Sequence, residues 1–344
     1  SNATTAGPGF VRQRGIVLQA SEQRALVVDT DGQALLSVDL SQNVGDRAIF
    51  SDSGTNIGAG PAFVAPASIA IDEANQRAFV VNPNGGSIYE VDLVTGDRVI
   101  LSDAVNGTGP VFSIPRGVTL DSTNNRLLVI ANPPSALFVV DIATGDRTIL
   151  SDASNGTGTL FSNPLRVAHD ADNGRALVTD STLDAVVAVD LATGNRSILS
   201  GPSNGTGTLL AAPIEIVMDS DNNRALLVDN QVDAVFGIDL TTGDRTILSS
   251  SGVGTGTNFS APVGIDYDAY LNRVLVVDTG LDQLLEVDLA TGDRSLVSSD
   301  TYSLPRNVAI DHAERRALVL DELDGIIYEV DLYDAVFGQN IPVA

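Results

Sequence analysis

The sequence predicts an all-β fold, a seven-bladed β-propeller with four antiparallel strands per blade. The main observation is an internal repeat of 49 residues, marked by five equally spaced prolines. Pro305 follows 43 residues after the last of them, and the alignment of Arg24 with Arg77 places a first copy, without a proline, at Gln13. Seven tandem copies of this length are typical of propeller blades. The five prolines are Pro66, Pro115, Pro164, Pro213 and Pro262.

Each copy contains four short apolar runs, which are separated by Asp, Asn, Gly, Ser and Thr residues. Runs of this length, rich in Val, Ile, Leu and Ala, are too short for helices and predict strands. The polar separators predict turns. In the copy that begins at Pro164, we expect strands at Arg166–His169, Ala176–Thr179, Ala185–Asp190 and Arg196–Leu199.

The last copy decides how the ring closes. It predicts three strands, at Asn307–Asp311, Ala317–Asp321 and Ile326–Asp331. Two segments compete for the fourth strand, Gly338–Ala344 and Phe10–Gln13, and Gly7–Gln13 aligns better with the loop before a blade. The C-terminal segment is therefore favoured. We expect a tag remnant and N-terminal tail over residues 1–9 and a single propeller domain over residues 10–344.

The composition excludes several classes of function. The chain has no cysteine, so disulfides, thiolate nucleophiles and cysteine-based zinc sites are absent. Its formal charge is -25, and all 19 basic residues are arginines. An acidic surface repels nucleic acids and anionic membranes, and no apolar run is long enough to span a bilayer. We expect a monomeric protein that is secreted, periplasmic or on the cell surface, with no nucleic-acid partner.

Two recurring strings carry a family resemblance. The segments NNRALLVD, over residues 222–229, and ATGDRTILS, over residues 143–151, resemble the repeats of NHL, YVTN and SMP-30-like propellers. The resemblance covers residues 10–344 and implies a seven-bladed propeller. It implies no single activity, because that superfamily includes lactonases, lyases and binding scaffolds.

Most charged residues belong to the repeat and are expected to be structural. Thirteen of the 19 arginines fall at two repeat positions, either before the second strand or after a TGD-type turn. An aspartate also closes every third strand, as Asp92 and Asp190 do. A residue that recurs in every blade serves every blade, so we expect these groups to make turn hydrogen bonds and ion pairs between blades.

The arginines outside the repeat predict an anion-binding site. In propellers of this kind, function is expected on one face around the central channel. Four of the six non-repeat arginines lie where innermost strands begin, and arginine forks match carboxylate, sulfate and phosphate groups. The alternative is that they pair with nearby acids such as Glu215 or Asp180. The predicted ligand-binding residues are Arg14, Ser68, Arg116, Arg166, Arg306 and Asn307.

A second set of residues predicts a metal site. Glu215, Asp266 and Asn307 lie on consecutive blades at positions expected to face the channel. Oxygen ligands of this kind suit Ca²⁺ or another divalent metal, and the resemblance to SMP-30-like lactonases implies a Glu, Asn and Asp set at the axis. The usual P-N-G motif of those enzymes is missing from most blades, however. Pairing of these acids with the channel arginines is the alternative.

No recognisable catalytic residues emerge from the sequence. Its two histidines, His169 and His312, are expected to be a packing residue and an exposed turn residue, and there is no G-x-S-x-G motif. The sequence therefore favours a non-catalytic propeller that binds a protein partner, an acidic small molecule or an acidic oligosaccharide at the mouth of its channel. The alternative is a metal-dependent hydrolase similar to SMP-30 and gluconolactonase.

Overall fold

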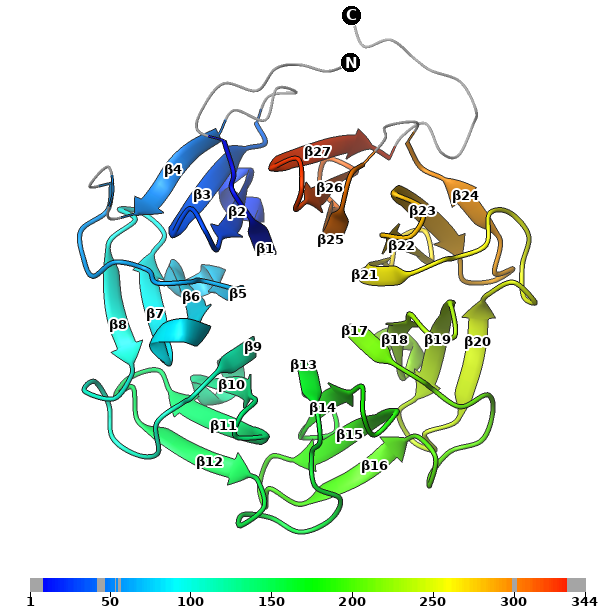
Figure 1. The fold of residues 1–344 in the computed structure, drawn as a ribbon, viewed down its shortest axis with the longest axis horizontal. Helices are drawn as coiled ribbons and strands as arrows, with labels where there is room; N and C mark the ends of the chain where they lie inside the picture. The colour runs from blue at the N-terminus through cyan, green and yellow to red at the C-terminus, as the bar shows by residue number, and fades with distance from the viewer. Residues whose placement is uncertain (1–8, 42–46, 53, 55–56, 299–301, 333–344) are drawn as a thin grey trace, which may run out of the picture.

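The structure is a computed structural model that describes residues 9–41, 47–52, 54, 57–298 and 302–332. Seven antiparallel sheets stand around a common axis (Figure 1). The innermost strand of each sheet contacts the innermost strands of both neighbouring sheets, and β25 contacts β1 to close the ring. The predicted seven-bladed β-propeller is thus confirmed.

Blades are numbered in chain order, and within each blade the strands run outward from the axis in sequence order. Blade 1 contains β1 (Gln13–Gln19), β2 (Arg24–Asp29), β3 (Ala34–Asp39) and β4 (Arg47–Asp52). Blade 2 contains β5 (Ser68–Asp72), β6 (Arg77–Asn82), β7 (Ser87–Asp92) and β8 (Arg98–Ser102). Blade 3 contains β9 (Pro115–Asp121), β10 (Arg126–Ala131), β11 (Ala136–Asp141) and β12 (Arg147–Ser151).

The next two blades repeat this arrangement. Blade 4 contains β13 (Pro164–Asp170), β14 (Arg175–Asp180), β15 (Ala185–Asp190) and β16 (Arg196–Ser200), so its four predicted strands are confirmed. Blade 5 contains β17 (Pro213–Asp219), β18 (Arg224–Asp229), β19 (Ala234–Asp239) and β20 (Arg245–Ser249). The described helices are short 3₁₀ turns, and none could cross a membrane: Ala20–Glu22, Glu73–Asn75, Pro83–Gly85, Ser122–Asn124 and Ser220–Asn222.

The last two blades lead to the closure of the ring. Blade 6 contains β21 (Pro262–Asp268), β22 (Arg273–Asp278), β23 (Gln283–Asp288) and β24 (Arg294–Leu296). Blade 7 contains β25 (Pro305–Asp311), β26 (Arg316–Asp321) and β27 (Ile326–Asp331), which confirms its three predicted strands. The predicted fourth strand, Gly338–Ala344, lies outside the described residues.

Apolar side chains are buried between neighbouring blades. Because successive side chains of a strand point to opposite faces of its sheet, the second and third strands are apolar on both faces and contact two neighbours. Phe138 of blade 3, for example, packs in one cluster with Phe79 of blade 2, and both are fully buried. This arrangement explains the near-continuous apolar runs of the sequence.

The first set of repeat arginines pairs within a blade, not between blades as the sequence suggested. Arg77 Nε lies 2.9 Å from Asp72 Oδ2, and Arg224 Nε lies 2.6 Å from Asp219 Oδ2. The aspartate ends the inner strand and the arginine begins the next strand, so the two residues face each other directly across the ladder. Short antiparallel pairing therefore brings the two charges together in the same hairpin.

In blades 2 to 6, the second set of repeat arginines joins the blade to the preceding one. Arg147 of β12 is almost fully buried, and its guanidinium donates to Ser102 Oγ of blade 2 at 2.6 Å. It also donates to the carbonyl oxygens of Asn106 and Pro110, each at 2.8 Å, in the loop that connects the two blades. These arginines thus hold the connecting loops through neutral acceptors. The expected turn hydrogen bonds of the third-strand aspartates are confirmed, for example at Asp92.

The N-terminal residues Phe10 and Gln13 contact blade 7 and so connect it to blade 1. Phe10 is buried in a cluster with Leu318 and Leu320 of β26. In the orientation that satisfies its amide, Gln13 donates to the carbonyl oxygen of Asp321 at 2.9 Å and accepts the Ile326 N–H at 3.1 Å. Residues at the start of the described chain therefore bridge to the last blade, although Phe10 itself lies outside β1.

We predict that the protein loses stability in acid. Eleven described aspartates have a lowered pKa, and Asp92 and Asp239 show the cause: backbone N–H groups of the turn bind the carboxylate. A lowered pKa in the folded state contributes stability above the unfolded pKa, and this contribution is lost as the pH falls through the folded value. Four described acids have a raised pKa and act in the opposite direction.

The eleven aspartates with a lowered pKa should outweigh the four acids with a raised pKa in their effect on stability. The melting temperature is therefore expected to fall as the pH drops below about 4, the range in which unfolded aspartates become protonated. Thermal denaturation followed by circular dichroism from neutral to acidic pH measures this. A melting temperature that stays constant or rises in that range would contradict the assignment.

Candidate functional site

The ring has two rims with different residues. The proline rim is the end at which the inner strands begin, together with the turns between second and third strands. The hairpin rim is the opposite end, formed by the turns between first and second strands. An inner strand of seven residues spans about 20 Å, so the two rims are separate surfaces. The predicted ligand-binding arginines all belong to the proline rim.

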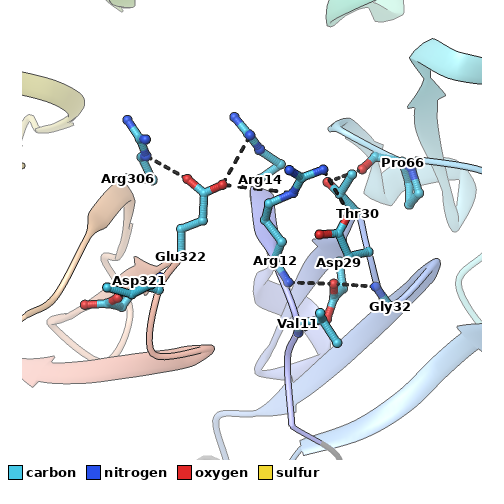
Figure 2. A network of polar contacts seen from close by, with 12 residues as sticks. Val11, Arg12, Arg14, Asp29, Thr30, Gly32, Pro66, Arg306, Asp321 and Glu322 are labelled. Atoms are coloured by element: carbon cyan, nitrogen blue, oxygen red, sulfur yellow. Dashed lines mark hydrogen bonds and ion pairs between the residues drawn. The ribbon is translucent and has the colours of Figure 1, made fainter.

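Three arginines converge on one glutamate at the proline rim, where blade 7 meets blade 1 (Figure 2). Glu322 follows β26, and its Oε2 lies 2.7 Å from Arg306 Nε while its Oε1 lies 3.2 Å from Arg14 Nη2. Arg12 Nε approaches the same Oε1 at 4.0 Å. The Glu322 side chain is 10% exposed, whereas Arg14 and Arg306 are 43% and 40% exposed. The glutamate is therefore covered and the arginines face solvent.

The backbone around Arg12 is fixed by a repeat aspartate. Asp29 ends β2, and its carboxylate accepts the backbone N–H groups of Val11 at 2.6 Å and Arg12 at 2.9 Å. It also accepts the Gly32 N–H at 2.8 Å in the following turn (Figure 2). Asp321 makes the equivalent contacts in blade 7, directly before Glu322. Both halves of the cluster thus stand on rigid turns.

The guanidinium groups of the cluster pair with two carboxylates. Besides Glu322, it contains one further acid, Asp31, which lies 2.8 Å from Arg12 Nη2 and is about half exposed. Three guanidinium groups thus face two carboxylates, while the carboxylates of Asp29 and Asp321 beside them bind backbone N–H groups. In a chain of net charge -25, this concentration of arginine is local to the junction of blades 7 and 1, which we call the seam cluster: Arg12, Arg14, Arg306, Glu322 and Asp31.

The other predicted arginines lie apart from the seam cluster. Arg166 Nε pairs with Glu215 Oε2 at 2.8 Å, which is the alternative that the sequence left open for this arginine. Arg116 Nη1 lies 3.4 Å from Asn163 Oδ1. The predicted group of four arginines is therefore divided over the rim, and two of its members, Arg14 and Arg306, share one partner.

The two neutral residues predicted to bind the ligand, Ser68 and Asn307, lie near the starts of the inner strands β5 and β25. Ser68 is half-buried at the start of β5, and a Cβ on Gly15 of β1 would lie 3.4 Å from its Cα. Asn307 follows Arg306, and its Oδ1 accepts the N–H of Val308 at 2.8 Å. A Cβ on Gly264 would lie 2.9 Å from the carbonyl oxygen of Arg306. Adjacent inner strands therefore approach closely here, and glycine at position 264 permits it.

The predicted metal ligands do not fit a divalent cation as they stand. Both carboxylate oxygens of Asp266 accept backbone N–H groups, from Tyr267 and Ile310, each at 2.8 Å. Glu215 binds Arg166, and the Asn307 oxygen is also engaged. Among the described residues, no three Asp, Glu or His side chains are grouped so that they could hold a metal ion. Burial raises the pKa of Asp266, which further disfavours a charged ligand there.

Two turns of the proline rim, in blades 4 and 5, carry additional aspartates. Burial and the neighbouring Asp229 raise the pKa of Asp184, in the turn after β14. Burial and Asp278 raise the pKa of Asp233, in the turn after β18. Blades 4 and 5 thus present crowded carboxylates, while the seam cluster presents guanidinium groups. We expect the carboxylates of blades 4 and 5 to disfavour an anion on that side of the rim.

Two functional candidates of the seam cluster escaped the sequence prediction. Arg12 precedes the first strand, at the position held by Ala65, Asn163, Ala212, Ala261 and Leu304 in other blades, which lies before the strand-start positions used in the prediction. Glu322 occupies the position held by Thr30, Ser181 and Asn230 in other blades. A comparison of the turns after the second strands would have shown Glu322 as a departure from the repeat. The sequence prediction rested only on the positions where inner strands begin.

Comparison with known proteins confirms the fold. No family model matches the sequence, and no curated protein matches it. The extracellular domain of a hybrid two-component system from B. thetaiotaomicron is similar with a TM-score of 0.72 and 15% identity, over 97% of this chain and 42% of that one. Hydrazine synthase from Kuenenia stuttgartiensis gives 0.70 and 12% identity, over 97% and 99%. Virginiamycin B lyase from Staphylococcus aureus gives 0.69 and 12% identity, over 91% and 93%.

These similarities concern the fold, because the sequence identities are low. This chain spans less than half the length of the extracellular-domain chain that it matches. The chain is a seven-bladed β-propeller, and its resemblance to NHL- and YVTN-like propellers is confirmed at the level of that fold.

Proposed function

We propose that the protein is a non-catalytic propeller of the cell exterior that binds an acidic ligand at the seam cluster of its proline rim. The observation that carries the proposal is the convergence of Arg12, Arg14 and Arg306 on the covered carboxylate of Glu322. The arginines are spread around one point and remain open to solvent. Guanidinium groups bind carboxylates and sulfates through paired hydrogen bonds.

Glu322 acts in this proposal as an internal counter-ion. It orients the two exposed arginines in the free protein and limits their mutual repulsion. A ligand carboxylate or sulfate would add a second acceptor on the solvent side of the same guanidinium groups, where five N–H donors per arginine leave room for it. The ligand class that fits best is an oligosaccharide with repeated acidic groups. One acidic group would bind the arginines, and the others would extend away from the acidic side of the rim.

The location outside the cytoplasm is part of the proposal. Its support is the strongly acidic composition and the similarity to an extracellular domain. We further propose that the protein acts as a monomer, with neither nucleic acid nor a membrane as its partner. The metal-dependent hydrolase alternative receives no support from the geometry of Glu215 and Asp266.

The exchange Glu322→Gln tests the role of the counter-ion. It preserves the size of the side chain but removes its charge, so the affinity for an acidic ligand such as tetragalacturonate is expected to rise several-fold. Isothermal titration calorimetry at low salt measures this. Asp324→Asn is the matched control, because it removes one negative charge from the same turn at a side chain that binds Ser303 and no arginine.

The two exchanges separate a local effect from a general one. Equal gains for Glu322→Gln and Asp324→Asn would show that only the overall charge matters. Unchanged or weaker binding by Glu322→Gln would contradict a counter-ion role at this site.

A further inference from the structure

We propose a second ligand site, on the hairpin rim between blades 6 and 7, that takes a small ring compound with one carboxylate. A pocket of about 330 Å³ opens there, between the turn after β21 and the turn after β25. Its volume lies at the lower end of the range for small-molecule sites. The seam cluster and this pocket lie at opposite ends of β25, so the two sites are independent.

Three residues at this pocket depart from the repeat, each in a different way. His312 follows the aspartate that ends β25, a position that holds Ala, Glu or Ser in the other blades. Tyr270 stands two positions after Asp268, where the other blades have Ala, Ser, Thr or Asp. Arg315 occupies the last position of its turn. All three line the same pocket, although they come from two blades.

Arg315 has a backbone conformation that is strained for an arginine. Arg315 has a φ of 52°, in the left-handed region that glycine and asparagine adopt with least strain. The other six blades place Gln, Asn or Gly at this position, with φ between 46° and 61°. An arginine maintained in such a conformation is an observation that points to function rather than to folding.

The exchange to arginine also changes what the pocket offers to a ligand. In blades 2 and 5, the hairpin arginine donates across to the next blade's asparagine, as Arg77 Nη2 does to Asn125 Oδ1 at 2.8 Å. At the junction of blades 6 and 7 the corresponding residues are Arg273 and Arg315, so a second guanidinium replaces the amide acceptor. Both arginines line the pocket, but Arg273 is buried and pairs with Asp268 and Glu286, so Arg315 is the arginine whose N–H donors a ligand carboxylate would approach.

In its turn beside this pocket, blade 6 also lacks a side-chain hydrogen bond that blades 2 to 5 make. In blades 2 to 5, an asparagine amide donates to both oxygens of the strand-ending aspartate, as Asn173 does to Asp170 at 2.9 and 3.0 Å. In blade 6, Leu271 replaces that asparagine. His312 Nδ1 lies 3.8 Å from Asp268 Oδ1 instead. The histidine thereby adds a donor at the wall of the pocket.

Tyr270 provides a surface for a ring. Its side chain is 81% exposed, although the Arg315 guanidinium lies 5.3 Å from the centre of the ring. A large exposed aromatic side chain next to a pocket is suited to stack on a sugar or aromatic ring. Ile310 and Leu332 add buried apolar walls. The Arg315 guanidinium beside the exposed Tyr270 ring therefore suits a ring compound that carries a carboxylate.

Two kinds of compound share this chemistry, and the test separates them. D-glucuronate and benzoate serve as the acidic probes, with D-glucose and benzyl alcohol as their neutral counterparts, and saturation-transfer NMR on the whole chain reports binding. We expect at least one acid to bind saturably and its neutral counterpart to bind much more weakly. Saturable binding of neither acid, or equal binding of acid and neutral compound, would overturn the proposal.

The decisive variant restores the repeat. Arg315→Asn places a favoured residue in the left-handed turn, so the melting temperature should stay constant or rise, while the affinity for the acid should fall at least about tenfold. Tyr270→Ala, which introduces the residue found in blade 2, should also weaken binding. Gln76→Asn changes the same turn position in blade 2 and should bind as the parent protein does. Parent-like binding by Arg315→Asn would overturn the proposal.

Discussion

Replacing Arg147 with alanine is expected to lower the free energy of unfolding by roughly 3 kcal/mol or more. The Arg147 side chain is 4% exposed and donates to Ser102 Oγ and to three carbonyl oxygens of the loop between blades 2 and 3. Alanine leaves these buried acceptors without a donor and opens a cavity beside Phe112, over whose ring the guanidinium lies. Both effects act on the same blade junction.

Urea denaturation followed by circular dichroism measures this loss. Arg116→Ala is the matched control, because Arg116 stands on β9 of the same blade, is only half-buried, and makes one long contact to Asn163. We expect it to shift the midpoint little. Equal shifts for the two variants would show that the buried guanidinium is not what holds the connecting loop.

The double exchange Arg14→Ala/Arg306→Ala is expected to weaken the binding of tetragalacturonate at least about tenfold. These two arginines are the exposed partners of Glu322, and hydrogen bonds to charged groups contribute more than those between neutral groups. The loss should shrink as salt is added, because exposed charges are screened. Calorimetric titration at two salt concentrations measures both effects.

Arg166→Ala is the matched control for this variant. Arg166 is as exposed as Arg306, but Glu215 holds it at 2.8 Å on another part of the rim. It should bind the ligand almost as the parent protein does. If Arg166→Ala weakens binding as much as the double exchange, the acidic ligand recognises the whole rim, and the seam cluster is not the site.

The sequence predicted the blades well because the repeat supplies the same information seven times. In blade 4, the four predicted strands are extended by at most two residues at an end. Apolar runs locate the strands, and the recurring turn residues separate them. The fourth strand of blade 7 remains a prediction, since Gly338–Ala344 lies outside the described residues.

Pairing partners were harder to predict than strands. The sequence suggested ion pairs between blades for the repeat arginines, whereas Arg77 pairs with Asp72 of its own hairpin. The register of an antiparallel pair decides this, and register depends on the turn between the strands. The second set of repeat arginines contacts the neighbouring blade mainly through backbone carbonyl groups. The sequence of side chains cannot predict such contacts, because every residue has a backbone carbonyl.

The contacts of the non-repeat arginines were predicted in part, and an anion site at them remains a prediction. Departures from the repeat at strand starts drew attention to Arg14, Arg166 and Arg306, and each of them pairs with an acid, as the alternative held. Glu322 was missed because it departs from the repeat in a different turn. Its meeting with Arg14 depends on the closure of blade 7 onto blade 1, a contact between residues far apart in the chain.

The most direct test of the seam cluster is a crystal structure of the protein with tetragalacturonate bound. The account predicts that a carboxylate of the ligand lies within hydrogen-bonding distance of the Arg14 and Arg306 guanidinium groups, with Glu322 still beneath them. A ligand bound elsewhere, at the hairpin rim or on the outer strands, with Arg14 and Arg306 unengaged would contradict the account.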